Sequence, residues 1–199
     1  MKKINVALAG NPNSGKSTIF NALTGSRQHI GNYPGVTVEK KQGTRRFGDY
    51  EINFVDLPGT YSLSAYSIEE RIARNYVIEN RPDVVVDIVD ASNVERNLYL
   101  TTQFMEMEVP LVLAFNMSDV AQRKGLVFDL EQLSKLLETP IVSTVGNREK
   151  GLDELLEAIV KTAERPHEPR TGKITYGGEI EQSLEELESM LEEKQPVPV

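Results

Sequence analysis

Residues 10–17 constrain this chain more than any other segment. They read Gly-Asn-Pro-Asn-Ser-Gly-Lys-Ser and fit the phosphate-binding pattern GxxxxGK[ST] at every fixed position. Glycines at both ends let the loop fold back and point its backbone N–H groups inward. The helix expected after the loop adds unpaired N–H groups and the positive end of its dipole. The sequence therefore predicts a loop that binds a nucleoside triphosphate.

The residues on either side support this interpretation. The apolar run 4–9 predicts a buried strand before the loop, and residues 17–23 predict a helix after it. The alternative, a glycine-rich turn in an unrelated α/β protein, would need neither this strand nor this helix. Lys16 can reach the β- and γ-phosphates, and the Ser17 hydroxyl is placed to ligate Mg²⁺. The expected phosphate-binding residues are Gly10, Asn11, Pro12, Asn13, Ser14, Gly15, Lys16, Ser17 and Thr18.

A second motif predicts which base the nucleotide carries. Asn116, Met117 and Asp119 follow the apolar run 109–115, a predicted parallel strand, and so lie at its carboxyl end, where open α/β sheets bind ligands. The Asp119 carboxylate can accept hydrogen bonds from the ring N–H and the exocyclic amine of guanine, a pair that adenine does not offer. Asn116 is expected to brace the surrounding loops and to meet the edge of the base.

This second motif is similar to the NKxD motif of GTPases, with Met117 in the position of the usual lysine. The thioether can still cover one face of the base, but the ammonium group is missing. An isolated N-x-x-D pattern is usually a helix cap, whereas its place after a phosphate-binding loop favours guanine. We therefore expect guanine selectivity with weaker nucleotide binding.

A third motif supplies two further candidate groups. The strand predicted over residues 51–55 ends in a DxxG motif formed by Asp56, Leu57, Pro58 and Gly59. The similarity to GTPases implies that Asp56 holds Mg²⁺ through water and that the Gly59 N–H contacts the γ-phosphate. Gly59 is therefore a candidate catalytic residue together with Lys16.

Residues 26–40 form the loop expected to respond to the γ-phosphate. Thr37, with Gly35 and Val36 beside it, can close onto Mg²⁺ when GTP is bound and withdraw after hydrolysis. Taken alone, Pro34-Gly35 indicates only a turn and Thr37 only the start of a strand. The order of the motifs along the chain favours a GTP-dependent switch.

A short loop after the predicted strand 140–142 completes the expected base site. Ser143, Thr144 and Val145 lie where related GTPases carry a SAK-like loop, and we expect the Thr144 backbone N–H to meet the guanine carbonyl. The polar residues 146–150 make this loop unusually long.

Strand and helix patterns alternate along residues 1–165, which predicts one α/β G domain. The expected fold is that of Ras-like P-loop GTPases, with a mainly parallel central sheet and helices on both faces. A predicted hairpin over residues 36–55 adds one antiparallel edge strand.

Residues 166–199 are expected to form a linker and the incomplete start of a helical domain. Their helical segment carries a stripe of Ile180, Leu184, Leu187 and Leu191. Two heptads do not stabilise a lone helix in water, so this short C-terminal helix must pack against another surface. We expect the chain to be a piece of a longer protein.

Composition excludes several classes of protein. The net charge of −8 argues against nucleic acid as the main partner. The absence of cysteine excludes disulfides and thiolate metal sites, and agrees with a reducing cytosol. The longest apolar runs are far shorter than the roughly 20 residues that span a bilayer, so the fragment itself is expected to be soluble.

Together the motifs closely resemble the cytosolic G domain of the ferrous iron transporter B (FeoB) family over residues 3–165. The specific marks are residues 31–39 (Gly-Asn-Tyr-Pro-Gly-Val-Thr-Val-Glu), 56–63 (Asp-Leu-Pro-Gly-Thr-Tyr-Ser-Leu) and the Asp90-Ala91-Ser92 segment with Glu95-Arg96-Asn97-Leu98-Tyr99-Leu100. The resemblance implies a GTP-binding and GTP-hydrolysing regulatory domain on the cytoplasmic side of a prokaryotic inner-membrane Fe²⁺ transporter. It also implies a following GDP-stabilising helical domain and a membrane-spanning domain as partners.

The residue after the DxxG motif predicts slow hydrolysis. Ras-like GTPases use a glutamine there to orient the attacking water, whereas this chain has the shorter Thr60. Asn13 matches the asparagine that ligates a catalytic potassium ion in FeoB-like and some other GTPases, so the resemblance implies K⁺ stimulation. A plain turn residue at this position, or an arginine supplied by a partner, stays an open alternative.

The complete prediction is a GTPase with GTP or GDP, Mg²⁺ and K⁺ as cofactors. Its catalytic residues are Asn13, Lys16, Thr37 and Gly59. Its metal ligands are Ser17, Thr37 and Asp56 for Mg²⁺ and Asn13 for K⁺. A soluble potassium-activated GTPase of ribosome assembly or RNA modification is the alternative, which a basic extension would favour over the acidic tail present here. A switch with negligible turnover and a homo-oligomer also stay open.

Overall fold

The computed structural model describes residues 1–25, 27–165 and 177–192, and the chain divides into two compact units, Met1–Pro169 and Arg170–Val199. The start of the predicted linker, residues 166–176, lies outside the described residues. No helix in the described part of the chain is long and apolar enough to cross a membrane.

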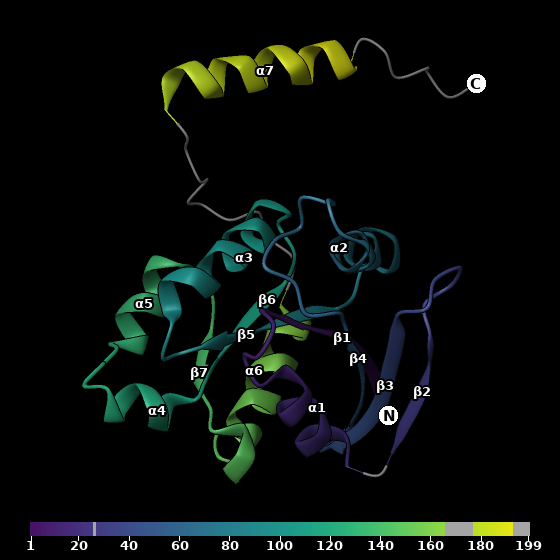
Figure 1. Ribbon diagram of the computed structural model, residues 1–199, viewed down its shortest axis with the longest axis vertical. Helices are drawn as coiled ribbons and strands as arrows, with labels where there is room; N and C mark the ends of the chain where they lie inside the picture. The colour runs from purple at the N-terminus through teal and green to yellow at the C-terminus, as the bar shows by residue number, and fades with distance from the viewer. Residues whose placement is uncertain (26, 166–176, 193–199) are drawn as a thin grey trace. The chain divides into compact units, whose positions relative to one another are not determined.

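Within the described residues, one seven-stranded sheet has the strand order β2-β3-β4-β1-β5-β6-β7 (Figure 1). Its strands are β1 (Lys2–Gly10), β2 (Gln28–Asn32), β3 (Glu39–Phe47), β4 (Tyr50–Asp56), β5 (Val84–Asp90), β6 (Leu111–Asn116) and β7 (Ile141–Ser143). Neighbours from β4 to β7 pair in parallel, whereas β3 pairs antiparallel with both β2 and β4. The predicted α/β fold class is confirmed.

Helices cover both faces of this sheet. They are α1 (Lys16–Thr24), α2 (Ile68–Asn80), α3 (Val94–Glu106), α4 (Ser118–Arg123), α5 (Leu130–Leu136), the 3₁₀ helix η1 (Gly146–Arg148) and α6 (Leu152–Glu164). One core joins α1 and α6 to the sheet, and the other joins α2, α3, α4 and α5 to the opposite face. Strand β5 serves both, because Val84 and Val86 enter the first core while Val85 and Val89 enter the second.

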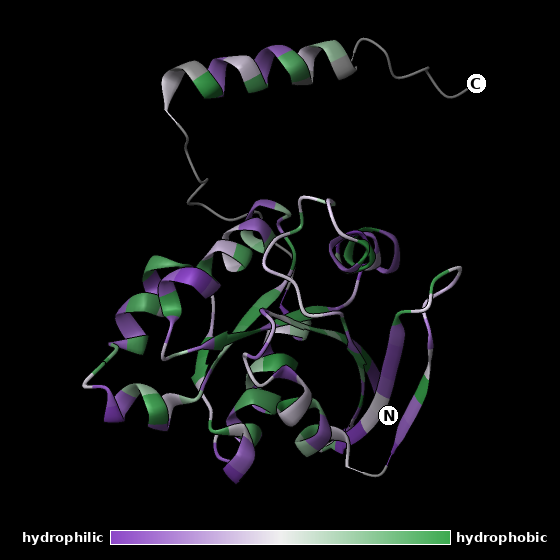
Figure 2. Cartoon of the chain, viewed as in Figure 1, coloured by the Kyte–Doolittle hydropathy of each residue, from purple (hydrophilic) through white to green (hydrophobic). Residues whose placement is uncertain are grey.

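The outer strand β2 was not predicted. Its residues Gln28–Asn32 were included in the loop 26–40, but they pair with β3 from Gln28↔Gly43 to Asn32↔Glu39. Figure 2 shows that β2 and β3 are mostly hydrophilic, and β2 is almost entirely exposed. A strand stabilised by edge hydrogen bonds, with little apolar burial, leaves no alternating apolar pattern to detect.

The start of α2 follows from its sequence. Ser67-x-x-Glu70 is a capping-box pattern, and the structure forms both of its hydrogen bonds. The Glu70 N–H donates to Ser67 Oγ at 3.1 Å, and the Ser67 N–H donates to the Glu70 carboxylate at 3.4 Å.

The second unit contains α7 (Gly178–Glu192). Ile180, Leu184 and Leu187 of its apolar stripe are 51%, 43% and 55% exposed. A helix is therefore present where the C-terminal helical segment was predicted.

Candidate nucleotide-binding site

The predicted phosphate-binding loop joins β1 to α1, and its two glycines are required by the backbone. Gly10 has φ +150, and a Cβ added to it would lie 2.7 Å from Ile88 O. Gly15 has φ +87, and its Cβ would lie 2.2 Å from Asn116 Nδ2. Asn13 also has a left-handed backbone, with φ 66, between them. Larger residues at either glycine would clash with backbone or with the bracing asparagine.

Lys16 and Asp56 meet at the ends of α1 and β4. The Lys16 ammonium contacts Asp56 Oδ1, and the two residues are 9% and 7% exposed. Burial raises the pKa of the Asp56 carboxyl, and the charge and hydrogen bond of Lys16 oppose that rise. A candidate phosphate ligand and a candidate Mg²⁺ ligand are therefore each other's counter-charge in this structure.

Asn116 joins three segments that are far apart in the sequence. Its Nδ2 donates to Ser14 O at 2.9 Å, which fixes the phosphate-binding loop. Its Oδ1 accepts from the Gly146 N–H at 2.9 Å and from Thr144 Oγ1 at 3.4 Å. Asn116 therefore links the phosphate-binding loop to the segment after β7, as the predicted bracing role requires.

The role predicted for the Thr144 N–H is wrong. This N–H donates to Phe115 O at 2.8 Å, and Thr144 is 1% exposed, so it extends the β6–β7 pairing and does not face a ligand. Ser143 ends β7 and is exposed, while Val145 is buried and pairs with Lys150. The polar residues 146–150 close into a short 3₁₀ turn in place of the expected long loop.

Gly146 is a residue of this site that sequence reasoning missed. A Cβ there would lie 2.9 Å from Ile19 Cγ1 and 3.4 Å from Asn116 Oδ1, so only glycine lets the turn approach α1 and the bracing amide. The available signal was a glycine directly after the SAK-like segment.

Asp119 lies in the first turn of α4 with its side chain 23% exposed. Two arginines approach the same oxygen, because Arg123 Nη2 and Arg148 Nη2 lie 3.6 and 3.9 Å from Asp119 Oδ2. Met117 has φ 57, and its Cε lies 3.5 Å from the Cβ position of Gly15. The thioether thus packs on the phosphate-binding loop, and the positive charge near Asp119 comes from arginines that the motif did not predict.

The loop that carries Thr37 is anchored at Tyr33. The Tyr33 hydroxyl donates to Asp56 O at 3.2 Å, and the Tyr33 N–H donates to Val38 O at 2.9 Å. Thr37 is exposed, and in the described part of the chain the structure records no contact from it to Ser17 or Asp56. The candidate ligand Thr37 is therefore not brought to the other candidate ligands in this structure.

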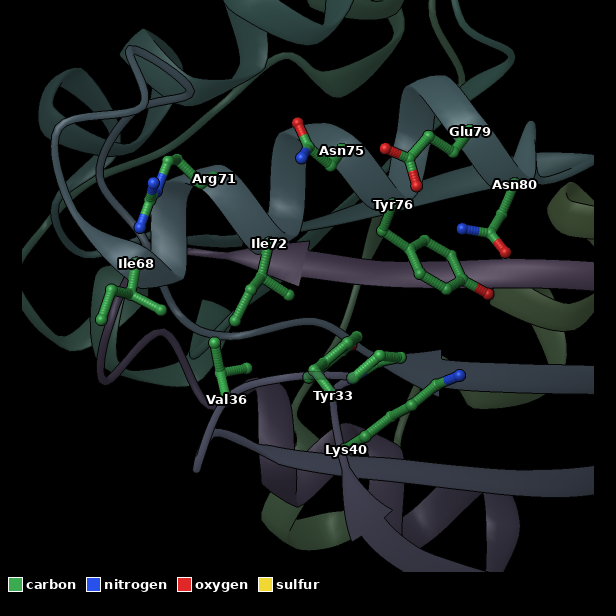
Figure 3. Close-up of a pocket in the computed structure, with 11 residues that line it drawn as sticks. Tyr33, Val36, Lys40, Ile68, Arg71, Ile72, Asn75, Tyr76, Glu79 and Asn80 are labelled. Carbon is green, nitrogen blue, oxygen red and sulfur yellow. The ribbon is translucent and has the colours of Figure 1, made fainter.

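A groove of about 460 Å³ separates this loop from α2 (Figure 3). Ile72 and Tyr76 project from α2 toward Tyr33, Val36 and Lys40 on the other side. Lys40 Nζ lies 5.7 and 5.8 Å from the ring centroids of Tyr33 and Tyr76, which is within cation–π range. Burial raises the pKa of Tyr33. The two ends of the loop are thus held by aromatic contacts, with open space beside Val36.

The DxxG segment lies against the phosphate-binding loop. A Cβ at Gly59 would lie 3.4 Å from Pro12 Cα, and the Thr60 N–H donates to Gly10 O at 3.3 Å. The Thr60 hydroxyl contacts the Ser62 carbonyl at 2.5 Å and Ser62 N at 3.1 Å. Because it is used within its own turn, this hydroxyl does not replace the glutamine that orients water in Ras-like GTPases.

Comparison with known proteins agrees with this geometry. The family model described as "Ferrous iron transport protein B" matches residues 4–159. The chain belongs to the FeoB family. A Fe(2+) transport protein A/Fe(2+) transporter FeoB fusion protein of Porphyromonas gingivalis is 49% identical over 98% of this chain. The Fe(2+) transporter FeoB of Escherichia coli K12 is 47% identical over 80% of it. The chain spans about a fifth of these FeoB relatives, 23% and 21% of their lengths.

Solved FeoB structures share the fold. The cytosolic domain of T. maritima FeoB in apo form aligns with a TM-score of 0.92 at 42% identity, over 98% of this chain and 76% of that one. The GMPPNP form of the same domain aligns with a TM-score of 0.91. The FeoB G-domain of Methanococcus jannaschii aligns at 47% identity with a TM-score of 0.75, over 83% of this chain and all of that one. The resemblance to an FeoB G domain is confirmed, and the soluble ribosome-assembly alternative is not favoured.

Proposed function

We propose that this chain is the GTP-hydrolysing regulatory domain of a ferrous iron transporter. The observation that carries the proposal is the convergence at one edge of the sheet. The ends of β1, β4 and β6 bring together the glycine loop, the Lys16–Asp56 pair and the Asn116 brace, with Asp119 beside them. Ligands bind at such carboxyl ends in open α/β sheets. Membership of the FeoB family supports GTP as the nucleotide and Fe²⁺ as the ion transported by the complete protein.

In this proposal, separate groups of residues bind separate parts of the nucleotide. The set Gly10 to Thr18 holds the phosphates, with Lys16 offsetting their charge. Asn116, Met117 and Asp119 hold the guanine, and the turn of Ser143, Thr144, Val145 and Gly146 supports them. Gly35 and Val36 flank Thr37 in the loop that closes on the γ-phosphate, and Leu57 and Pro58 place Gly59 beside it.

The donor set at the phosphate end suits Mg²⁺. Ser17, Thr37 and Asp56 offer hydroxyl and carboxylate oxygens, which this ion prefers. The buried Asp56 carboxylate would gain a new counter-charge when Lys16 turns to the phosphates. Mg²⁺ bound there would neutralise charge on the phosphate oxygens.

During hydrolysis the protein must position the reacting groups and stabilise the charge on the phosphate oxygens. A water oxygen forms a bond to the γ-phosphorus as the bond to the β–γ bridging oxygen breaks, and the water proton leaves with the phosphate product. The Gly59 N–H and Lys16 stabilise charge on the γ-phosphate. Asn13 is exposed, and no hydrogen bond of its side chain is recorded among the described residues, so its amide oxygen is available to a K⁺ ion.

Two measurements on this chain test the proposal. Titration should show binding of GDP and GTP and much weaker binding of ADP and ATP, because Asp119 pairs with guanine. Phosphate release from GTP should be slow but measurable with Mg²⁺ present. Failure to bind guanine nucleotides would remove the proposal, and binding without phosphate release would reduce it to an interaction switch.

The transporter role is tested in the longer protein. The proposal places residues 1–165 as the G domain on the cytoplasmic side, followed by the linker and helical segment 166–199 and the membrane-spanning partner domain. Asp119→Asn in the full-length protein should lower Fe²⁺ uptake by cells at unchanged protein level. Uptake equal to that of the parent would separate the GTPase from transport.

A further inference from the structure

Arg96 on α3 contacts two segments of the nucleotide site with two different groups. Its guanidinium carbon lies 4.2 Å from the centroid of the Tyr61 ring, in the segment that follows Gly59. Its backbone carbonyl accepts a hydrogen bond from Asn11 Nδ2 of the phosphate-binding loop at 3.3 Å. A planar guanidinium stacks on an aromatic face better than an ammonium does.

The segment 60–63 is docked on α3 at a second point. The Leu63 N–H donates to Gln103 Oε1 at 2.7 Å, about two helical turns along α3 from Arg96. Figure 1 shows the connection between β4 and α2 passing beside this helix. Tyr61 is 41% exposed, so Arg96 supplies a contact that holds an otherwise accessible ring.

Helix α3 is itself fixed to the sheet. The Asp90 N–H donates to Asn97 Oδ1 at 3.2 Å, and the Thr101 hydroxyl donates to Asp87 Oδ2 at 2.5 Å. Leu100 and Phe104 are fully buried in the core on this face. The helix is therefore a rigid support for the residues that follow the DxxG motif.

We infer that Arg96 is a positioning residue for GTP hydrolysis: it holds Tyr61 on α3 and so fixes the direction of the Gly59 N–H toward the γ-phosphate. Gly59 is held on its N-terminal side by the Asp56 end of β4 and on its C-terminal side by the segment 60–63 docked on α3. Loss of the Tyr61 contact would therefore loosen the C-terminal side. The inference rests on the proposed GTPase function and adds a residue that does not touch the nucleotide.

Arg96→Ala removes the ring contact and leaves the backbone carbonyl that binds Asn11. We expect kcat for GTP to fall roughly tenfold while the Kd for GDP stays within about twofold, because only the γ-phosphate contact is disturbed. The preference for a non-hydrolysable GTP analogue over GDP should fall with kcat. Arg74→Ala, an exposed arginine on α2, is the matched control and should behave as the parent.

Three further variants separate stacking from charge. Arg96→Lys should fall between Arg96→Ala and the parent, because an ammonium keeps the charge but stacks less well than a guanidinium. Tyr61→Phe should keep the parent rate because it keeps the ring. Tyr61→Leu should match Arg96→Ala, and combining the two should add little further loss if they act through one contact. Full activity in Arg96→Ala or Arg96→Lys, or additive losses in the double variant, would overturn the inference. If the parent releases no phosphate, the proposed turnover fails, and the analogue-to-GDP preference still tests Arg96.

Discussion

At the scale of single residues, Asp119 is the group that distinguishes guanine from adenine. Asp119→Asn replaces one acceptor oxygen with a donor, so the paired contact to guanine is lost. A good bidentate contact contributes about 1–3 kcal/mol, or roughly tenfold to a hundredfold in affinity. Titration should show GTP and GDP weakened alike, with a gain for xanthine nucleotides. Glu131→Gln, in the exposed pair with Lys135, is the control for lost charge, and unchanged GDP affinity in Asp119→Asn would refute the assignment.

Asn13 carries the second prediction at this scale. A K⁺ ion held by its amide oxygen would place positive charge near the phosphates, where charge develops during hydrolysis. Phosphate release should therefore be faster in potassium than in sodium at equal ionic strength, a comparison that removes general screening. Asn13→Ala should abolish the difference and keep nucleotide binding, since Lys16 and the loop N–H groups stay in place. Equal rates in both salts would leave slow intrinsic turnover or a partner's arginine as the explanation.

At the scale of elements, the loop between β2 and β3 is the part expected to move. Tyr33 and Lys40 hold its ends, whereas Thr37 is exposed and Gly35, with φ +74, has open space around it. Thr37→Ala should slow GTP hydrolysis and leave GDP binding nearly intact, because the hydroxyl is needed only with the triphosphate. Thr37→Ser keeps the hydroxyl and should retain most of the rate. Parent-level hydrolysis in Thr37→Ala would show that this loop is not the switch.

The contact between β5 and α3 predicts a dependence of stability on pH. Burial raises the pKa of Asp87 to about 7, although the hydrogen bond from Thr101 opposes the rise. In the folded protein Asp87 therefore keeps a proton that it releases at about pH 4 in the unfolded chain. Because the folded state binds more protons between these values, the free energy of unfolding falls as pH rises through this window.

Asp87→Asn removes that titration and keeps an acceptor for the Thr101 hydroxyl. At pH 8 it should raise the free energy of unfolding, by at most about 4 kcal/mol for a shift of this size. At pH 4.5 it should have little effect. Urea unfolding at both pH values measures the difference, with Asp49→Asn in the exposed β3–β4 turn as the control. An equal effect at the two pH values would show that Asp87 does not titrate as described.

At the scale of the whole molecule, most of the fold could be predicted because its signals are apolar. The buried strands β1, β5 and β6 are mostly hydrophobic, and α6 has a clear apolar face. Strand β2 is polar and exposed, so its sequence carries no comparable signal.

The candidate site likewise has residues that could be predicted from the sequence and contacts that could not. Motif residues such as Lys16, Asp56 and Asn116 could be predicted because their spacing is fixed by backbone geometry, and the structure brings them together. The contacts that support these motif residues could not be predicted. The Thr144 N–H is used in sheet pairing, and Arg148 reaches Asp119 from a turn whose shape depends on the close approach of Gly146 to α1.

The Asn116 brace has a consequence for how strongly any ligand binds. The Asn116 amide links Ser14 of the phosphate-binding loop to Gly146 near the base site. The distance between the phosphate half-site and the base half-site is therefore fixed before a ligand binds. A molecule that spans both half-sites loses its freedom of motion only once, and the second half then binds at a high effective concentration. Guanosine and pyrophosphate added together should therefore bind far more weakly than GDP, although they offer nearly the same contacts. The covalent link in the nucleotide is itself a large part of what this site recognises.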